Sequence, residues 1–434
     1  PVQPPAGVMD SRGAEAFVID YAGEANLATF RFAHDGLQVM AAEEAFEVDG
    51  HAFHAGSFIL PTEGNPANLA DMLEEAAWEF GFVALGLETM PEVAHHPVGT
   101  PRVAVMHTWT TTQQEGWLRV GLDQYEIPYD YISVHEARDT RDLKGRYDVI
   151  IIGPSTTDAL SLLRGVQGDQ PMPWKASDVT PNLGRQDETD DMRGGLELQG
   201  VMHLQNFVEA GGVLITIGNS AVLPIHFGMA EGVSIRTTSE LWAPGGVFRT
   251  RITDQDSPIA YGYGEDLGVY FNRAPVFARG GGGRGFRRGG GSGLQPSDDG
   301  STTARRTGRG TVNSPDIVQG RPVNMGQAGV EAFREAERAR REAEEAEGPA
   351  GPSTPSPSTR VVASFPSQPT DLLISGGLVA GSELASAPAV VDAPRGEGHI
   401  VMFSFNPFWR GETLGSYAML LNAVLHHDNL DVGR

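Results

Sequence analysis

The sequence predicts an α/β protein whose main domain is a parallel β-sheet flanked by helices, and residues 102–154 carry most of this prediction. An apolar run at 103–106 ends at a polar turn, and an amphipathic segment follows it. Two further extended runs lie at 127–134 and 147–152. Parallel strands that are buried on both faces read as continuous Val/Ile runs, and the order strand, helix, strand, strand is typical of the start of a parallel βαβ sheet.

Length and composition limit the class of protein. A chain of 434 residues with 40% hydrophobic residues is long enough for two or three domains with well-formed cores. The 56 acidic and 32 basic residues give a net charge of −24, which argues against nucleic acid or an anionic membrane surface as a partner and favours solubility. No run of about 18 apolar residues occurs, so we expect no membrane insertion.

Cysteine is absent, which excludes disulfides, thiolate metal sites and a cysteine nucleophile. The chain opens on Pro1 and shows no charged-then-apolar signal-peptide pattern. We therefore expect it to be a piece of a longer product.

A small α/β connecting domain is predicted at 14–90, after a flexible lead-in at 1–13. Strands are expected at 16–20, 37–40, 57–60 and 83–87, with a turn at 48–51. Helices are expected at 24–32 and 68–80; Asn68 or the preceding turn would cap the second helix and Gly81 would end it. A proline-bounded linker at 91–101 would lead to the next domain.

The larger domain is predicted in two parts, 102–278 and 361–434. A long polar excursion at 155–194 would cover the carboxyl edge of the sheet, since it is too long for a plain connection. A helix at 196–210 that ends at Gly211, a strand at 213–217, a further helix and a strand at 247–252 follow. The second part contains a hairpin, 389–391 with 399–405, and a closing helix at 414–426.

Residues 279–360 are predicted to be a low-complexity disordered insertion. They open on a Gly/Arg-rich cluster, close on a Pro/Ser-rich one and include a charged helix near 331–347 with almost no apolar face. The basic cluster allows an RNA contact, but the acidity of the chain favours a flexible insert. The insertion interrupts a domain without ending it.

Sheets of this type bind ligands at the carboxyl ends of their strands. In this chain that edge carries His107, and the ligand-cleft candidates are Trp109, Glu115, Trp117, Arg119 and Asn219. For Glu115 the alternative is a favourable charge in the first turn of a helix. For the tryptophans the alternative, which we favour, is packing against a neighbouring domain.

Several blocks of sequence share their order and spacing with a known family. They are VAVMHTW, EGWLRVGLDQYEIPYD, YDVIIIGP, FVEAGGVLITIGNSA and the hairpin with the closing helix. These blocks resemble the class I glutamine amidotransferase-like domain at the C-terminus of many bacterial zinc-carboxypeptidase-family proteins. The segment at 14–90, with FVID, AEEAFEVDGHAFHAGSFILP and a helix before the linker, resembles the piece that precedes that domain. The resemblance thus covers most of 14–430 except the insertion.

The resemblance implies a flavodoxin-like sheet and an upstream zinc exopeptidase domain in a periplasmic or secreted protein. Zinc is expected only in that upstream domain, and no cofactor is expected in this chain. None of the 12 histidines has Glu three positions later, and His51 and His54 have zinc-like spacing but no carboxylate placed to complete a site. We therefore predict no metal site here. The pairs at 95–96 and 426–427 are predicted to be solvated.

An active amidotransferase of this class carries a cysteine nucleophile on a sharp turn after a strand. The matching turn here is Gly218, Asn219 and Ser220, so amidotransfer is excluded. Ser220 is a candidate nucleophile, with His226 or His203 as base. A serine after a strand is more often a helix N-cap, and six positions along one helix give poor geometry for a dyad.

The prediction is thus a non-catalytic C-terminal region of a zinc-carboxypeptidase-like protein that acts as a scaffold or a substrate-recruiting surface. Its expected partner is the upstream peptidase domain or a peptide substrate, and the oligomeric state stays open. The alternatives are an independent exported module that binds a small molecule or a glycan and, less favoured, a Ser-dependent hydrolase.

Overall fold

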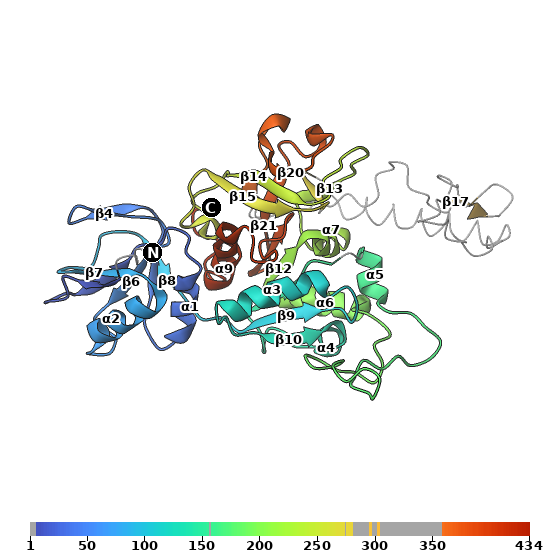
Figure 1. Cartoon of the computed structure of the whole chain (residues 1–434), viewed down its shortest axis with the longest axis horizontal. Helices are drawn as coiled ribbons and strands as arrows, with labels where there is room; N and C mark the ends of the chain where they lie inside the picture. Colours follow the sequence, from blue (N-terminus) through green and yellow to red (C-terminus); the bar gives the residue numbers. More distant parts are fainter. Residues whose placement is uncertain (1–5, 156–157, 274, 281–294, 297–301, 304–357) are drawn as a thin grey trace, which may run out of the picture. The chain divides into compact units, whose positions relative to one another are not determined.

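The computed structural model describes residues 6–155, 158–273, 275–280, 295–296, 302–303 and 358–434. The chain divides into two compact units, one of residues 1–282 with 357–434 and the other of residues 283–356. The architecture below belongs to the first unit (Figure 1). In the second unit only β17 (Gln295–Pro296) and β18 (Thr302–Thr303) are described, and they pair antiparallel. The first and last residues of the expected insertion, Arg279 and Arg360, lie in strands. Most of its remaining residues, including the helix expected near 331–347, lie outside the described residues.

The larger domain is built on a ten-stranded sheet with the strand order β10-β9-β11-β12-β22-β21-β19-β14-β15, and β20 pairs with β14. The first five strands are parallel. Numbered along the chain, their order is 2-1-3-4-5, which is the flavodoxin-like order. The predicted fold class is therefore confirmed.

The parallel strands are β9 (Val103–His107), β10 (Asp130–Ser133), β11 (Val149–Ile152), β12 (Val213–Ile217) and β22 (Gly398–Phe403). The antiparallel extension consists of β14 (Gly246–Ile252), β15 (Asp266–Phe271), β19 (Arg360–Ser364), β20 (Leu373–Gly376) and β21 (Pro388–Arg395). The expected hairpin is present, because β21 pairs with β22 from Val390 opposite Phe403 to Arg395 opposite Gly398. A separate two-stranded sheet is formed by β13 (Val233–Arg236) and β16 (Val276–Arg279).

Helices cover both faces of the parallel strands. Alternate strand residues such as Val105 and Ile151 share one core with α3 (Gln113–Gln124) and α9 (Tyr417–Leu425). Their neighbours in sequence, such as Met106 and Ile150, share a second core with the helices of the opposite face. Those helices are α4 (Val134–Asp139), α5 (Ala159–Arg164), α6 (Glu197–Glu209) and α7 (Val222–His226). Short 3-10 turns lie at Gly218–Ala221, Pro258–Ala260, Pro369–Asp371, Gly381–Glu383 and Leu414–Ser416.

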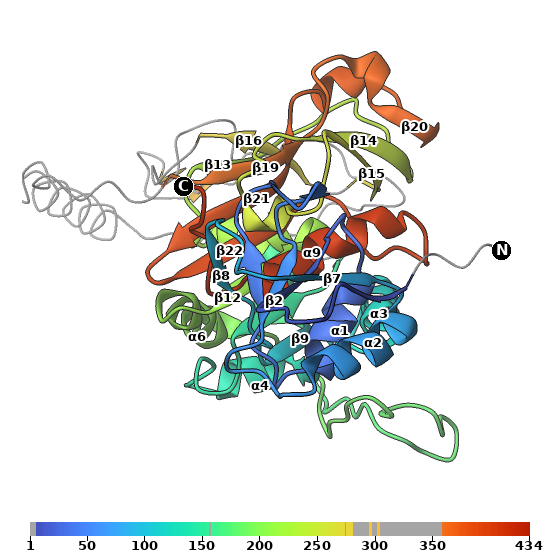
Figure 2. The same ribbon diagram turned by 90° about the vertical axis from the view of Figure 1, so that its left-hand side faces the viewer.

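The N-terminal part contains a six-stranded sheet with the order β1-β7-β2-β6-β3-β8. Its strands are β1 (Gly7–Met9), β2 (Ala16–Ile19), β3 (Met40–Ala42), β6 (Phe58–Pro61), β7 (Val83–Leu87) and β8 (His95–Pro97). One face packs on α1 (Asn26–Ala33) and α2 (Leu69–Phe80), whereas the other carries the hairpin of β4 (Phe46–Val48) and β5 (His51–Phe53). Figure 2 shows α1 and α2 together on this sheet.

Two expectations for the N-terminal part were wrong. The lead-in contributes β1, which pairs parallel with β7. The linker contributes β8, whose His-His-Pro sequence gave no strand signal and which pairs with β3 at the edge of the sheet, where a proline is tolerated. The expected ends of α2 are confirmed: Asn68 occupies the N-cap position, without a side-chain capping bond, and Gly81 ends the helix in the left-handed conformation with φ of 76°.

The expectation that the histidine pairs are solvated was also wrong for three of the four residues. His96 lies in β8 and is buried, and His426 and His427 are buried at the end of α9. An isolated histidine in a polar or proline-rich stretch carries no local signal of burial. The surroundings of these rings come from elements that are far away in the sequence.

The extended run predicted at 127–134 is a shorter strand, β10, followed at once by α4. The Ser133 hydroxyl accepts a hydrogen bond from the Glu136 N–H at 3.2 Å and so caps the new helix. The excursion (residues 158–194 of the described chain) begins with α5 and then forms the long green loop that leaves the body of helices and strands in Figure 1. No helix in the described residues is long and apolar enough to cross a membrane.

Candidate functional site

The point where the strand order reverses, between β9 and β11, is the usual ligand crevice of a flavodoxin-like sheet. Here the space beside Glu115, Gly153 and Leu162 measures only about 10 Å³, which is room for about one water. A Cβ added to Gly153 would lie 2.7 Å from Cγ of Glu115, so this side chain is pressed against the turn after β11. The crevice is therefore filled by Glu115.

Glu115 is a buried carboxylate held by two donors. Arg119 Nε donates to Oε1 at 2.7 Å, and the Tyr131 hydroxyl donates to Oε2 at 3.0 Å. Burial raises the pKa of Glu115, and the bonds from Arg119 and Tyr131 oppose that rise. The Arg119 guanidinium also lies over the Tyr131 ring, 4.4 Å from its centre. These contacts hold the side chain of Glu115 in one position at the carboxyl edge of the sheet.

His107 ends β9 and lies against the same tyrosine. Its ring stacks on Tyr131 with centres 4.1 Å apart and planes 12° apart. The His107 Nε2 is 2.9 Å from Oδ2 of Asp187, and Nδ1 is 3.2 Å from the Thr108 carbonyl oxygen. Both ring nitrogens thus face oxygen acceptors, and only a doubly protonated imidazole can donate to both.

Trp109 lies next to His107 at the end of β9. It is buried and packs edge-on against His107 at 5.0 Å. Its indole Nε1 donates to Nδ1 of His135 at 3.2 Å, and Nε2 of His135 lies 3.2 Å from the Gly194 carbonyl oxygen. Trp109 therefore packs within the larger domain and not, as we favoured from the sequence, against a neighbouring domain.

A cavity of about 190 Å³ lies beside these residues, and we call it the edge cavity. Its inner wall comes from the ends of β9 and β10 with α3, and its outer wall comes from the excursion. The lining residues are His107, Thr108, Trp109, Thr112, Arg119, Tyr131, Trp174, Asn182, Leu183, Gly184, Arg185, Gln186 and Asp187. As expected from the sequence, the excursion covers the carboxyl edge of the sheet.

The charges around the edge cavity are unlike those of the chain as a whole. Arg119 is neutralised by Glu115, whereas Arg185 is exposed and has no ion-pair partner in the described part of the chain. Asp187, at 2.9 Å from His107, contributes the single carboxylate of the lining. In a strongly acidic protein, the edge cavity thus carries one exposed arginine against one carboxylate and no excess of negative charge.

The structure brings together only some of the predicted site residues. Trp109, Glu115 and Arg119 lie at the edge cavity or directly behind it, whereas Trp117 and Asn219 are half-buried and line neither space. Sequence reasoning missed Tyr131 and Asp187. Tyr131 read as an ordinary strand residue, and Asp187 lies in a polar stretch where nothing marks one carboxylate among many.

Ser220 and His226 do not form a catalytic pair. Ser220 is fully buried; its hydroxyl accepts from the Ile217 N–H at 2.9 Å and lies 3.0 Å from the Ile152 carbonyl oxygen. His226 is exposed at the end of α7, and its ring contacts Phe227. The serine hydroxyl ties β12 to β11 and is not presented to a substrate.

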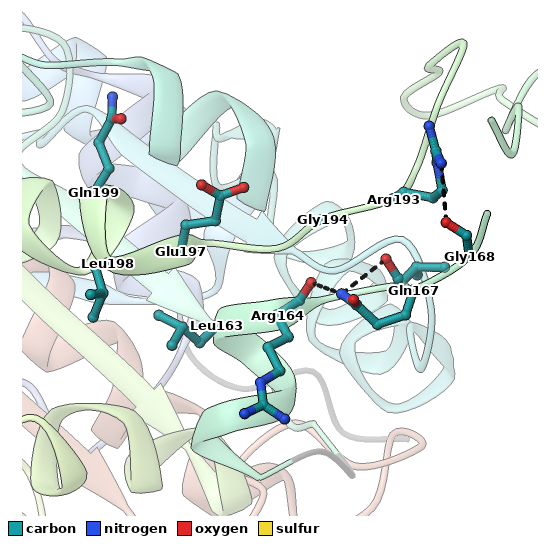
Figure 3. A pocket seen from close by; sticks show the side chains of 10 residues that line it. Leu163, Arg164, Gln167, Gly168, Arg193, Gly194, Glu197, Leu198 and Gln199 are labelled. Carbon is teal, nitrogen blue, oxygen red and sulfur yellow. Dashed lines mark hydrogen bonds between the residues drawn. The ribbon is translucent and has the colours of Figure 1, made fainter. Parts of the chain in front are cut away.

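A larger, open depression of about 620 Å³ lies between the end of α5 and the start of α6 (Figure 3). Its polar side chains do not converge. Gln167 Nε2 donates to the Arg164 carbonyl oxygen at 2.6 Å, and Arg193 Nη1 donates to that of Gly168 at 3.1 Å. Arg164 and Glu197 point in opposite directions in this view. We therefore place the candidate site at the edge cavity.

Metal ligands do not cluster in the described residues, where no group of three or more His, Cys, Asp or Glu side chains could hold an ion. His54, a member of the zinc-like pair in the sequence, instead lies 2.9 Å from Asp20 through Nδ1. Asp20 also accepts a bond from the Ser57 hydroxyl at 3.1 Å. These contacts are those of a surface hydrogen-bond network.

No protein-family model matches the chain, and no curated protein matches its sequence. Among solved structures, it is similar to a cytoplasmic protein of Salmonella typhimurium, with 10% identity, a TM-score of 0.33 and coverage of 74% of this chain and 97% of that one. A ThuA-like protein of Bacteroides uniformis has 8% identity and a TM-score of 0.34, with 78% and 97% coverage. A β-galactosidase of Bacillus circulans has 10% identity and a TM-score of 0.35, with 77% of this chain but only 32% of the enzyme covered. These similarities are too distant to carry a functional argument.

Proposed function

We propose that this chain is the non-catalytic accessory region of an exported zinc-carboxypeptidase-like protein and that its edge cavity recruits peptide. The sequence blocks that resemble this family support the first part of the proposal. The observation that carries the second part is the edge cavity itself, where aromatic faces and an exposed guanidinium meet at the carboxyl edge of a parallel sheet.

The lining suits a peptide. Trp174 is half-buried, so its exposed part offers an apolar surface to a side chain. Arg185 offers a guanidinium to a carboxylate, which every peptide with a free C-terminus carries. A volume of about 190 Å³ accommodates one or two residues and not a long segment.

The non-catalytic character is supported by the turn after β12. In an active amidotransferase of this class the turn carries a cysteine nucleophile, but here it carries the buried Ser220 hydroxyl bonded to the backbone. This arrangement supports a binding role for the chain, with catalysis in the proposed peptidase domain.

Calorimetric titration of the purified chain with short peptides tests the proposal. We expect Arg185→Glu to weaken peptide binding about tenfold, which corresponds to about 1.4 kcal/mol. Arg164→Glu is the matched control, because Arg164 is also exposed but lines the open depression. The proposal is overturned if no peptide binds, if both variants weaken binding equally, or if the chain hydrolyses peptides in a manner that Ser220→Ala abolishes.

A glycan is the second candidate ligand, and one observation favours it. Beside Trp174, the amides of Asn182 and Gln186 line the edge cavity, and an aromatic face with amide donors and acceptors is suited to a sugar. An oligosaccharide panel is therefore titrated in parallel. Sugar binding that Trp174→Ala removes and Arg185→Glu spares would replace the peptide proposal.

A further inference from the structure

We propose that Asp187 is an internal pseudo-ligand: its carboxylate occupies, at His107, the place that a ligand carboxylate takes. The excursion would then have to release His107 before the edge cavity can accept its ligand. This inference rests on the proposed function of the edge cavity, and it specifies the class of ligand as a carboxylate.

The ring of His107 is held in one orientation, in which its Nε2 can bind an anion. The ring is 3% exposed, it is stacked on Tyr131, and its Nδ1 faces the Thr108 carbonyl oxygen. Nε2 is therefore aimed into the edge cavity, where it meets Asp187 at 2.9 Å. A group that replaced Asp187 would find this nitrogen already oriented.

The Asp187 carboxylate is in turn held by its own backbone. Its Oδ1 accepts a hydrogen bond from the Glu188 N–H at 2.8 Å, while Oδ2 faces His107. The side chain remains 27% exposed, so water reaches the pair from outside. A carboxylate with one oxygen facing an imidazole nitrogen and the other on a backbone amide is held as a ligand carboxylate would be.

Hydrogen bonds between residues on either side of the segment 182–187 hold the base of the excursion together. The backbones of Trp174 and Thr189 exchange hydrogen bonds of 2.8 and 3.0 Å, and Asp191 accepts from the Met172 N–H at 3.1 Å. Residues 182–187 form the part of the excursion that faces the edge cavity. Loss of the contact with His107 would free this wall while the base of the excursion stays in place.

The charges of the lining explain why the ligand should be an anion. Once Asp187 has moved away, the charged or chargeable groups that remain in the lining are Arg119, Arg185 and His107. Arg119 is satisfied by Glu115, so Arg185 and His107 are left without an anion. The C-terminal carboxylate of a peptide fits this need, whereas an amidated C-terminus does not.

Calorimetric titration with one N-acetylated dipeptide, as the free acid and as the C-terminal amide, tests the inference. We expect Asp187→Ala to raise the affinity for the free acid at least fivefold and to leave that for the amide unchanged. Asp187→Asn should give an intermediate gain. The control is Asp190→Ala, which removes an equal charge from the same excursion, where Asp190 pairs with Lys175, and it should raise neither affinity.

Hydrogen exchange at 180–187 gives a second readout that needs no ligand. Exchange there should be faster in Asp187→Ala than in the wild type, with the sheet residues unchanged. Unaltered exchange, or an affinity for the free acid that Asp187→Ala leaves equal or lowers, overturns the inference while peptide recruitment stands. If neither the wild type nor Asp187→Ala binds either peptide form, peptide recruitment fails as well.

Discussion

Nε2 of His96 lies 3.1 Å from Nδ1 of His426, although the two residues are 330 positions apart. His96 lies in β8 of the N-terminal sheet and His426 follows α9 of the larger domain, so this bond joins the N-terminal sheet to the end of α9. His96 Nδ1 also lies 3.2 Å from Oε1 of Glu43. One ring must accept from the other, and two imidazolium rings cannot make this bond.

This pair makes stability depend on pH. Burial lowers the pKa of His426 well below its usual value, with His96 and His427 acting in the same direction. Burial also lowers the pKa of His96, against the opposing influence of Glu43. The other titratable groups that face the pair are His95 and Tyr261.

The folded state therefore keeps these rings neutral at a pH at which the unfolded chain takes up protons. Their contribution to stability is complete above the unfolded pKa of about 6.5 and decreases as the pH falls below it. We expect a loss of about 1.4 kcal/mol per pH unit for each ring that stays neutral. Urea unfolding at pH 7.5 and 5.5 measures this change in the free energy of unfolding. His426→Gln should flatten this dependence, and His51→Gln, at an exposed position, should not; equal slopes for the wild type and His426→Gln would contradict the assignment.

A second prediction concerns Glu115. Removal of its carboxylate in Glu115→Ala leaves the Arg119 guanidinium and the Tyr131 hydroxyl without their acceptor. We expect a loss of about 2–4 kcal/mol in the free energy of unfolding. Glu115→Gln keeps the shape and one acceptor and should cost less. The control is Gln124→Ala, at an exposed position of the same helix, which should change stability by less than about 0.5 kcal/mol. An equally small effect of Glu115→Ala would show that the pair of Glu115 and Arg119 contributes nothing to stability.

The fold was predictable where burial leaves a mark in the local sequence. β9, β11 and β12 are buried along their whole length and read as apolar runs, and Gly81 marks the end of α2 because a left-handed residue is needed there. The site was predictable only in part. Glu115 and Arg119 are one helical turn apart, so their pairing follows from the spacing, whereas His107 and Asp187 are 80 positions apart and meet only through the path of the excursion.

A third prediction separates the structural from the catalytic role of Ser220. Ser220→Ala removes a buried hydroxyl that accepts from the Ile217 N–H and bonds to main-chain carbonyl oxygens. We expect a loss of about 1–3 kcal/mol, because these groups are left without a partner away from water. Ser375→Ala, at an exposed position of β20, is the control and should have little effect. Unchanged stability of Ser220→Ala, together with the loss of a hydrolytic activity, would reverse the assignment.

The final prediction concerns the replacement of two glycines of α3 by alanine. The two replacements should change the free energy of unfolding in opposite directions. A Cβ added to Gly121 would lie 2.1 Å from Cδ1 and 2.7 Å from Cε1 of Phe408. This ring is fully buried and lies 4.1 Å from the ring of Tyr417, so it has no space to move into. Overpacking of this kind costs about 1–3 kcal/mol, and we expect Gly121→Ala to be destabilised by an amount in that range.

A Cβ added to Gly116, by contrast, meets no atom within 4 Å. Gly116→Ala should therefore stabilise the protein by about 0.5–1 kcal/mol, because alanine loses less backbone entropy than glycine in a helix. Urea unfolding of both variants measures the difference. In a Phe408→Ala background, Gly121→Ala should lose most of its cost, since the ring atoms that the new methyl group meets are gone. A cost that persists in that background would mean that the contact between α3 and Phe408 is not its source.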